Sequence, residues 1–228
     1  MRHLIPQAAL IMSVLVAGAS ACDDATTTAT GPSAPYAIGM NGGNVQAATA
    51  GSALPLPLLV HVTDQYGVGF AGAVVTFTAT GGATTTATTV TTDANGDASN
   101  TATLGTSAGI DSITASIAGV VVPVRFSETA LAGPPATDSI ASGNVQVGTS
   151  GTALPVPLSV VVLDGHGNRV AGDTVTWVSA TGTLSAPVTV TDAFGIASVQ
   201  LMPALGANTV TASIGGSTLV ATFTETGN

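Results

Sequence analysis

The sequence predicts an all-β fold of two tandem antiparallel β-sandwiches, and three observations lead to it. Nearly the same stretch of about 90 residues occurs twice, both copies alternate apolar and polar residues with a period of two, and turns rich in Gly and Asp separate these runs. Short alternating segments punctuated in this way are typical of sandwiches. Beyond the N-terminal segment, no stretch shows the 3.6-residue period of a helix.

The repeat is clearest near the start of each copy. Residues 43–46 and 143–146 both read Gly-Asn-Val-Gln, and the Leu-Pro-Leu-Pro-Leu at 54–58 returns with one change at 154–158. The offset between the copies is 100 residues here and falls to 97 by Thr114, which matches Thr211. Offsets that change only between blocks indicate two copies of one domain whose loops differ in length.

Alternation assigns one face of each strand to the core. In the first copy, Leu58, Val60 and Val62 share a face, and the matching residues of the second copy repeat the pattern. Because successive strand side chains point to opposite faces, these residues are expected in the core, and Trp177 is expected between the two sheets. The other matching core positions are Val75, Phe77, Ile113, Ala115, Ile117, Val124 and Phe126 in copy one and Val175, Trp177, Val210, Ala212, Ile214, Ala221 and Phe223 in copy two.

Turn chemistry separates the strands. Residues 64–67 and 164–167 begin with Asp and end with Gly, and so do residues 93–96 and 192–195. Asp side chains hydrogen-bond the turn backbone, and Gly accepts a positive φ without strain. About seven short strands are expected in each copy.

Composition limits the kinds of partner. Only 7% of the residues are charged, the formal net charge is −9, and Arg, at positions 2, 125 and 169, is the only strongly basic residue type. Because nucleic-acid binding needs clustered basic side chains to neutralise phosphates, this composition excludes nucleic acid as a partner.

Residues 1–21 are predicted to be an export signal. Arg2 and His3 precede an apolar run from Ala8 to Val16, and small residues follow at 19–21. The run is shorter than the roughly 20 residues of a membrane-spanning helix. Cleavage after residue 21 would release a secreted protein.

Cys22, the only cysteine, points to a membrane anchor instead. Small residues followed by this cysteine and two aspartates resemble the lipobox of bacterial lipoproteins, although Ala19 stands where that pattern prefers Leu. The resemblance implies that Cys22 becomes the lipidated first residue, which would place the protein in the cell envelope. Unlipidated export is the alternative.

Composition also predicts the domain boundaries. Residues 22–34 lack hydrophobic periodicity and are interpreted as a flexible tether, and the Gly-Pro-Pro at 133–135 indicates a linker over residues 130–137. The two domains are then expected at 35–129 and 138–228.

Both copies resemble the bacterial immunoglobulin-like domain of the invasin and intimin type. In the second copy the resemblance lies in residues 143–146, 151–155, 160–164 and 170–172, and it continues through 208–212. It implies an Ig-like sandwich used as a stalk or spacer on bacterial surfaces, sometimes in adhesins. The predicted fold is therefore two tandem immunoglobulin-like antiparallel β-sandwiches. With two repeats, a short surface lipoprotein is expected rather than a host-cell adhesin.

The histidines give little sign of catalysis. His61 falls on the face opposite the predicted core and is replaced by Val161 in the other copy, while His166 lies in a turn and matches Tyr66. A catalytic His needs a carboxylate and a nucleophile beside it, and neither histidine has such a sequence context. Both are expected to be exposed and without function, in a protein that is not an enzyme and needs no cofactor.

Acidic residues suggest structural rather than chemical roles. Asp93, Asn95 and Asp97 superficially suggest calcium, but the second copy replaces the latter two by Phe194 and Ile196. A turn and no metal site are therefore expected.

A carboxylate also recurs near the end of each copy. Glu128 and Glu225 lie in matching Phe-x-Glu-Thr segments. These glutamates are predicted to be exposed at strand ends, and not to form a glycosidase pair.

The predicted function is that of a non-catalytic cell-envelope lipoprotein whose Ig-like domains act as a spacer or as a surface-display or adhesion module. The expected partners are the membrane, through the lipid anchor, and an envelope or surface protein or glycan. The alternative is a recognition protein that binds glycan or protein through the domain 1 loops, with Tyr66 and Phe70 as candidate ligand-binding residues.

Overall fold

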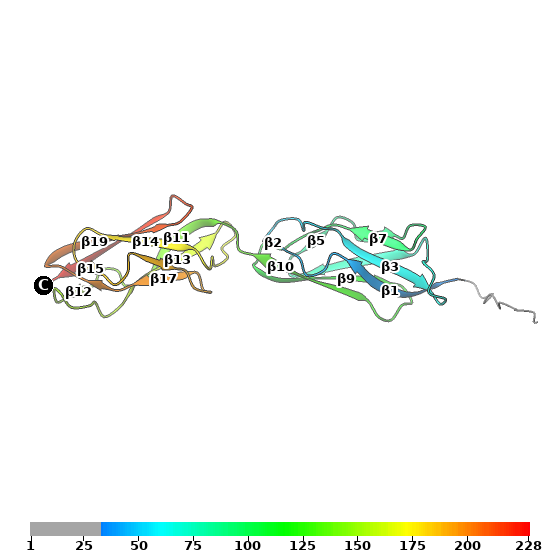
Figure 1. Cartoon of the computed structure of the whole chain (residues 1–228), viewed down its shortest axis with the longest axis horizontal. Coiled ribbons are helices and arrows are strands. Elements are labelled where there is room, and N and C mark those ends of the chain that lie inside the picture. The colour runs from blue at the N-terminus through cyan, green and yellow to red at the C-terminus, as the bar shows by residue number, and fades with distance from the viewer. Residues whose placement is uncertain (1–32) are drawn as a thin grey trace, which may run out of the picture. The chain divides into compact units, whose positions relative to one another are not determined.

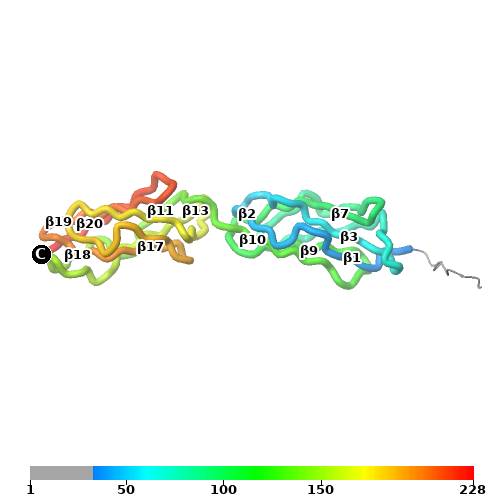
Figure 2. The backbone as a smooth tube through the Cα atoms, viewed as in Figure 1, coloured from blue at the N-terminus to red at the C-terminus, as the bar shows by residue number. Residues whose placement is uncertain are grey.

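The structure, a computed structural model, describes residues 33–228. The predicted signal peptide (1–21), Cys22 and the tether up to residue 32 lie outside the described residues. Within the described part every regular element is a β-strand, and no helix there could cross a membrane. Figures 1 and 2 show two sandwiches, one drawn from blue to green and the other from yellow-green to red, and each has its own core. The predicted all-β fold of two tandem sandwiches is confirmed.

Each sandwich has ten strands, several of only two or three residues. Domain 1 contains β1 (Pro35–Gly42), β2 (Ala47–Thr49), β3 (Leu58–Asp64), β4 (Val74–Thr80), β5 (Thr84–Thr85), β6 (Thr89–Thr91), β7 (Asp97–Asn100), β8 (Ala102–Thr103), β9 (Gly109–Ile117) and β10 (Val124–Leu131). Domain 2 contains β11 (Pro135–Ser142), β12 (Val147–Gly148), β13 (Leu158–Asp164), β14 (Thr174–Ser179), β15 (Thr183–Leu184), β16 (Val188–Val190), β17 (Ile196–Val199), β18 (Leu201–Met202), β19 (Gly206–Ile214) and β20 (Val220–Gly227).

The two domains share one topology. A three-stranded sheet in the order β1-β3-β7 faces a five-stranded sheet in the order β2-β10-β9-β4-β6, and β5 and β8 form a small third sheet. Domain 2 repeats all three with β11-β13-β17, β12-β20-β19-β14-β16 and β15-β18. The pairing is antiparallel except at one edge, where β2 runs parallel to β10 and β12 runs parallel to β20.

Strand pairing extends into both ends of the predicted linker, residues 130–137. Leu131 continues the parallel pairing with β2, and Pro135 already pairs with Asp164 at the start of β11. Only residues 132–134 lie between the strands. Pro is tolerated at a first strand position because no ladder hydrogen bond from its nitrogen is needed there.

The turn that begins at Asp164 contacts the chain before and after this connection. The backbone N–H of Gly133 donates to Asp164 Oδ2 at 2.8 Å. The Asn168 amide accepts from Ala108 N at 2.8 Å and donates to Thr106 O at 2.9 Å. Burial alone would raise the pKa of Asp164, but hydrogen bonds from Asn168, Gly133 and the turn backbone lower it to about 2.

The core positions agree with the alternation in the sequence. Leu58, Val60 and Val62 are fully buried, and their counterparts in domain 2 are buried to the same extent. Trp177 is buried in the core of domain 2, where its ring centroid lies 5.9 Å from that of Phe223. The prediction for Trp177 is therefore confirmed.

The repeated Gly-Asn-Val-Gln segment carries the chain from one sheet to the other. In domain 1 it lies between β1 of the three-stranded sheet and β2 of the five-stranded sheet. Gln46 holds this crossover, because its side chain donates to Gly43 O at 2.7 Å and Leu56 O at 3.0 Å and accepts from Leu56 N at 2.8 Å. Val45 adopts a positive φ of 59°, and Val145 repeats it at 61°, a strained conformation for a β-branched residue.

The two glutamates predicted to be exposed are buried, so that prediction was wrong. Glu128 is 0% and Glu225 is 2% exposed. Glu128 lies on β10, between β9 and the parallel strand β2, and its Oε2 accepts from Gln46 N at 2.5 Å. Glu225 accepts from Gln146 N in the same way, and the other carboxylate oxygen of each glutamate has no hydrogen-bond partner. Each carboxylate therefore fastens the crossover segment to the five-stranded sheet.

Burial gives these glutamates a distinct pH dependence. Burial raises the pKa of Glu128 and of Glu225 above the ordinary value of 4.5, against the hydrogen bonds from the crossover backbone. A group whose pKa is raised by folding contributes stability that is present below pH 4.5 and is lost as the pH rises through the folded-state pKa. For Glu128→Gln, which cannot titrate, we expect the loss in free energy of unfolding relative to wild type to be largest in acid and to shrink toward neutral pH.

Urea unfolding of wild type and Glu128→Gln across the acid-to-neutral range tests this expectation. Glu225→Gln is the matched variant in domain 2, where Asn208 stands opposite the glutamate in place of Asp111. The same sign is expected in both domains. A difference that grows with pH, or that does not change with pH, would contradict the assignment.

Candidate functional site

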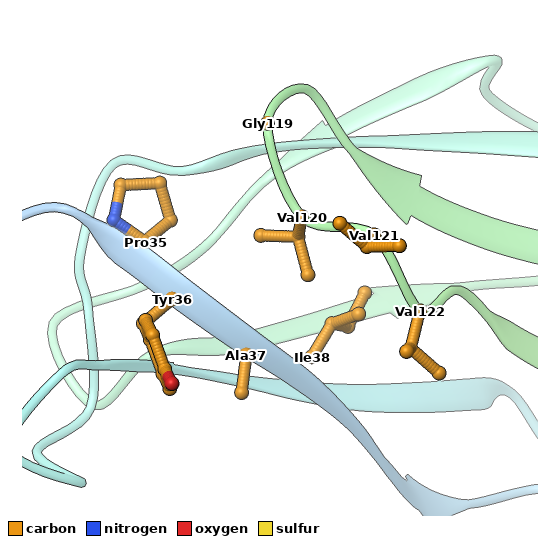
Figure 3. A pocket seen from close by; sticks show the side chains of 8 residues that line it. All are labelled: Pro35, Tyr36, Ala37, Ile38, Gly119, Val120, Val121 and Val122. Carbon is orange, nitrogen blue, oxygen red and sulfur yellow. The ribbon is translucent and has the colours of Figure 1, made fainter.

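The candidate site is the end of domain 1 at which the described chain begins, here called the N-terminal end of domain 1. It consists of residues 33–36, 64–70, 92–97 and 118–123. Pairing of Pro35 with Asp64 brings the first two segments together, and a hydrogen bond from Val62 N to Gly96 O brings in the third. Figure 3 shows a hollow at this end, lined by residues 35–38 and 119–122.

Asp64 organises the 64–70 segment. Its Oδ1 accepts from Tyr66 N at 2.8 Å and from Val68 N at 3.0 Å, and its Oδ2 accepts from the Ser33 hydroxyl at 2.9 Å. Burial opposes ionisation, but these hydrogen bonds outweigh it and lower the pKa of Asp64 below 3.8. As expected from the sequence, the aspartate is a turn residue, like Asp164 in domain 2.

The structure separates the two candidate ligand-binding residues. Tyr66 is 45% exposed. Phe70 is half-buried, packs against the core, and donates its backbone N–H to Val62 O at 2.8 Å. Tyr66 is thus available to a partner and Phe70 mainly supports the loop. A ligand-binding role for this loop stays a prediction.

Apolar side chains are exposed at this end to an extent that the sequence alone did not indicate. Val121 is 92% and Val122 is 73% exposed, and Tyr36 and Val68 are exposed as well. Figure 3 shows both valines on the 118–123 loop, beside the strand that carries Tyr36. Together with Tyr66, these four residues are called the apolar tip. A sequence feature that could have pointed to it is the Val-Val-Val-Pro run at 120–123, which the second copy lacks.

The same end of domain 2 has a different chemistry. The positions that match the apolar tip hold Ala136, His166, Asn168, Thr218 and Leu219. Leu219 packs against the core of its domain, and Asn168 is engaged with residues 106–108. The apolar tip is therefore a feature of domain 1 and not a requirement of the fold.

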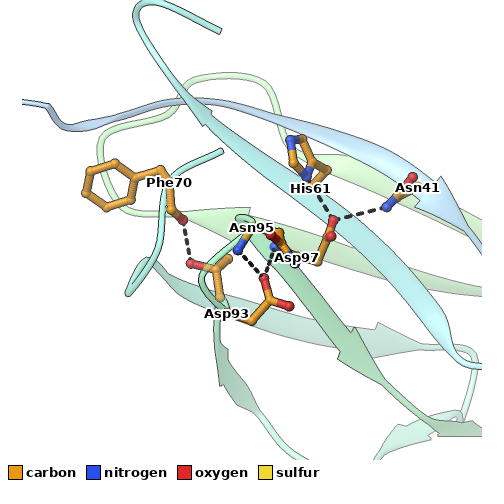
Figure 4. A network of polar contacts seen from close by, with 7 residues as sticks. Asn41, His61, Phe70, Asp93, Asn95 and Asp97 are labelled. Atoms are coloured by element: carbon orange, nitrogen blue, oxygen red, sulfur yellow. Dashed lines mark hydrogen bonds and ion pairs between the residues drawn. The ribbon is translucent and has the colours of Figure 1, made fainter. Parts of the chain in front are cut away.

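A polar cluster lies on one side of the N-terminal end. Asp97 Oδ1 accepts from His61 Nδ1 at 2.8 Å and from Asn41 Nδ2 at 3.0 Å (Figure 4). Asp93 Oδ1 accepts from the backbone N–H groups of Asn95 and Asp97 at 2.8 and 2.9 Å, which lowers the pKa of Asp93. The Asp93 turn is as expected, and it recurs in domain 2.

The surroundings of this cluster can be described from the lining of the hollow beside it. Between residues 33 and 228, no group of three or more His, Cys, Asp or Glu side chains could hold a metal ion. The hollow beside His61 is lined by residues 37–41 together with Thr63 and Asp97, which include no serine or cysteine. No carboxylate is adjacent to His61 in the sequence, but the register of β3 against β7 places Asp97 opposite it. The positions paired in this way in domain 2 are Val161 and Ile196.

The two layers of strands, their order and the sheet crossover define each domain as an immunoglobulin-like β-sandwich. Residues 43–132 match the family model of the bacterial Ig-like domain, group 1. The first sandwich is thus similar to this family, and the second repeats its strand order as a tandem copy.

Solved structures with the same fold include two from bacterial proteins. InvD of Yersinia pseudotuberculosis is 20% identical, with a TM-score of 0.54 over 84% of this chain and 57% of that one. FdeC, an Escherichia coli adhesin, is 18% identical, with a TM-score of 0.50 over 86% of this chain and 66% of that one. The chain thus spans less than two thirds of either structure. No curated protein matches it.

Proposed function

We propose that the protein is a lipid-anchored cell-envelope protein whose tandem Ig-like domains act as a surface-display or adhesion module. The main support for this proposal is that the residues repeated in both domains have structural roles. Residues 43–46, the buried glutamates and the turn aspartates all hold the sheets and loops together, in both domains. The residues that the two copies share therefore stabilise the fold. A pair of stable domains of this kind suits a spacer between an anchor and a partner.

The similar structures support the surface location. FdeC is described as an adhesin of Escherichia coli, and a related role is proposed for this chain on the ground of shared fold and tandem arrangement. A protein or glycan on another surface is the proposed partner. The membrane is the second partner, through Cys22 and the acyl chains that a lipobox cysteine would carry. Each buried methylene of such chains contributes about 0.8 kcal/mol, so several chains would hold the protein firmly.

Replacing Cys22 tests the anchor. Wild type is expected to partition into the detergent phase and to give a Cys22 peptide whose mass includes acyl chains. Cys22→Ala is expected to move into the aqueous phase, with an unchanged thermal unfolding profile. Ser20→Ala, a change to another small residue in the same segment, serves as the control and is expected to partition like wild type. Equal partitioning of Cys22→Ala and wild type would refute the anchor.

A further inference from the structure

We propose that the apolar tip of domain 1, formed by Tyr36, Tyr66, Val68, Val121 and Val122, rests on the lipid bilayer surface. This inference depends on the lipidation of Cys22 proposed above. It goes further, because an anchor alone leaves open which face of the protein contacts the membrane. Three observations support it: the length of chain between anchor and tip, the chemistry of the tip, and the difference between the two domains.

The chain length places the tip near the bilayer. Ser33 lies only 11 positions after Cys22, and its hydroxyl donates a hydrogen bond to Asp64 at this end of the domain. Even fully extended, 11 residues span at most about 40 Å. The opposite end of domain 1 continues into domain 2, so the N-terminal end is the part of the folded protein that the anchor holds closest to the lipid.

The chemistry of the tip suits the interface between water and lipid. Tyr places an apolar ring and a polar hydroxyl at the headgroup level, and tyrosines are enriched at membrane interfaces. The two tip valines of the 118–123 loop are mostly exposed, at 92% and 73% of their surface. Residues exposed to this degree contribute little to the core, so the core does not explain why they are apolar.

The charges at this end favour a zwitterionic over an anionic bilayer. Arg125 is the only Lys or Arg between residues 33 and 168. The carboxylates of Asp64 and Asp93 are engaged by backbone amides, and Asp97 is paired with His61. With so few cations, attraction to anionic lipid is weak, and burial of apolar surface is the term that remains.

Domain 2 provides an internal control. It has the same fold but lies farther along the chain from Cys22. The matching positions at its end hold none of the five tip residues, and its one exposed aromatic residue there is Phe194 of the 192–195 turn. The fold does not need an apolar tip, and the tip occurs in the domain that follows the anchor.

Spin-label accessibility on phosphatidylcholine vesicles tests the proposal with the full processed chain. A nitroxide is attached to Val121→Cys or, as the matched control, to Thr218→Cys in the equivalent loop of domain 2. Lipidation blocks the Cys22 thiol, so only the new cysteine is labelled. On vesicles, the label at position 121 is expected to lose accessibility to a water-soluble nickel chelate and to gain accessibility to oxygen. The label at position 218 is expected to stay accessible to the chelate.

A second set of variants tests the tip as a unit. A label at Val68→Cys is expected to be protected on vesicles as well. Combining Val121→Asp with Val122→Asp is expected to remove most of that protection, whereas Thr218→Asp leaves it unchanged. Both valines are exposed, so these changes are not expected to unfold the domain.

Three outcomes would overturn the proposal. If mass spectrometry shows acyl chains on Cys22 but the label at position 121 stays accessible to the chelate, the tip does not contact lipid, and the proposed display function stands. If Cys22 carries no acyl chains, the proposed anchor and this inference fail together. If the label is shielded on intact cells but not on vesicles, a protein covers the tip instead of lipid.

Discussion

Replacing Trp177 by Ala is expected to lower the free energy of unfolding of domain 2 by about 3–5 kcal/mol, the range found for large aromatic residues in cores. Trp177 is 2% exposed and packs against Phe223, and its Nε1 donates to Thr189 Oγ1 at 2.8 Å. Single domains are stable by only about 5–15 kcal/mol, so the loss is a large share of the total.

Calorimetry and circular dichroism can measure this loss domain by domain. The hydrophobic core of each domain is separate, so we expect the transition of domain 2 to move to lower temperature and that of domain 1 to stay in place. A shift of both transitions by the same amount would contradict this.

Domain 1 supplies the control for Trp177. Its matching residue is Phe77, and the position that matches Thr189 holds Val90. The indole and its hydroxyl partner are thus replaced together by two apolar side chains. The double variant Trp177→Phe with Thr189→Val is expected to be more stable than Trp177→Phe alone, since the single change leaves the Thr189 hydroxyl without its partner.

The second large effect is expected from Gly43→Ala. Gly43 has a φ of +81°, and a Cβ there would lie 2.0 Å from Pro57 O. The left-handed conformation costs a non-glycine residue about 1–2 kcal/mol. Forcing the crossover away from residue 57 adds about 1–3 kcal/mol, as overpacking does elsewhere. We expect both terms in Gly43→Ala and, by the same geometry, in Gly143→Ala.

Gly67→Ala separates the two terms. Gly67 has a similar φ of +77°, but nothing lies within 4 Å of its Cβ position. Only the conformational term of about 1–2 kcal/mol applies to it. Chemical denaturation of the two variants should therefore place Gly43→Ala well below Gly67→Ala in stability. Equal losses would show that the crossover can relax at little cost.

Much of the fold could be predicted because its signals are local. The alternation at Leu58, Val60 and Val62 assigns the core face by itself, since side chains two residues apart share a side of any strand. Turn aspartates such as Asp64 act on amides two and four residues ahead, so their role is also readable from neighbouring residues. Trp177 was predicted correctly for the same reason.

The buried glutamates could not be predicted in this way. Glu128 continues an alternating strand, but its burial depends on the short parallel strand β2 and on residues 43–46, about 80 positions away. The parallel strands at this edge are only two or three residues long, which is too short to show a recognisable pattern in the sequence. A charged residue at the end of a strand is most often exposed, and only the crossover segment reverses that expectation here.

The candidate site was harder still to predict, because residues that are far apart in the sequence form it. The side chains of His61 and Asp97 are 36 positions apart and meet because β7 pairs with β3 in one particular register. The apolar tip draws Tyr36, Tyr66 and Val121 from three separate segments, and each alone reads as an ordinary surface residue.

The sequence was therefore sufficient for the two-domain repeat, the strand faces, the turns and the Trp177 core position, because each rests on spacing within a few residues. Burial of Glu128, the pairing of His61 with Asp97 and the gathering of the apolar tip were decided only in three dimensions. Strand register and sheet crossover are set by the packing of the whole sandwich, and a one-residue slip would change every such partner.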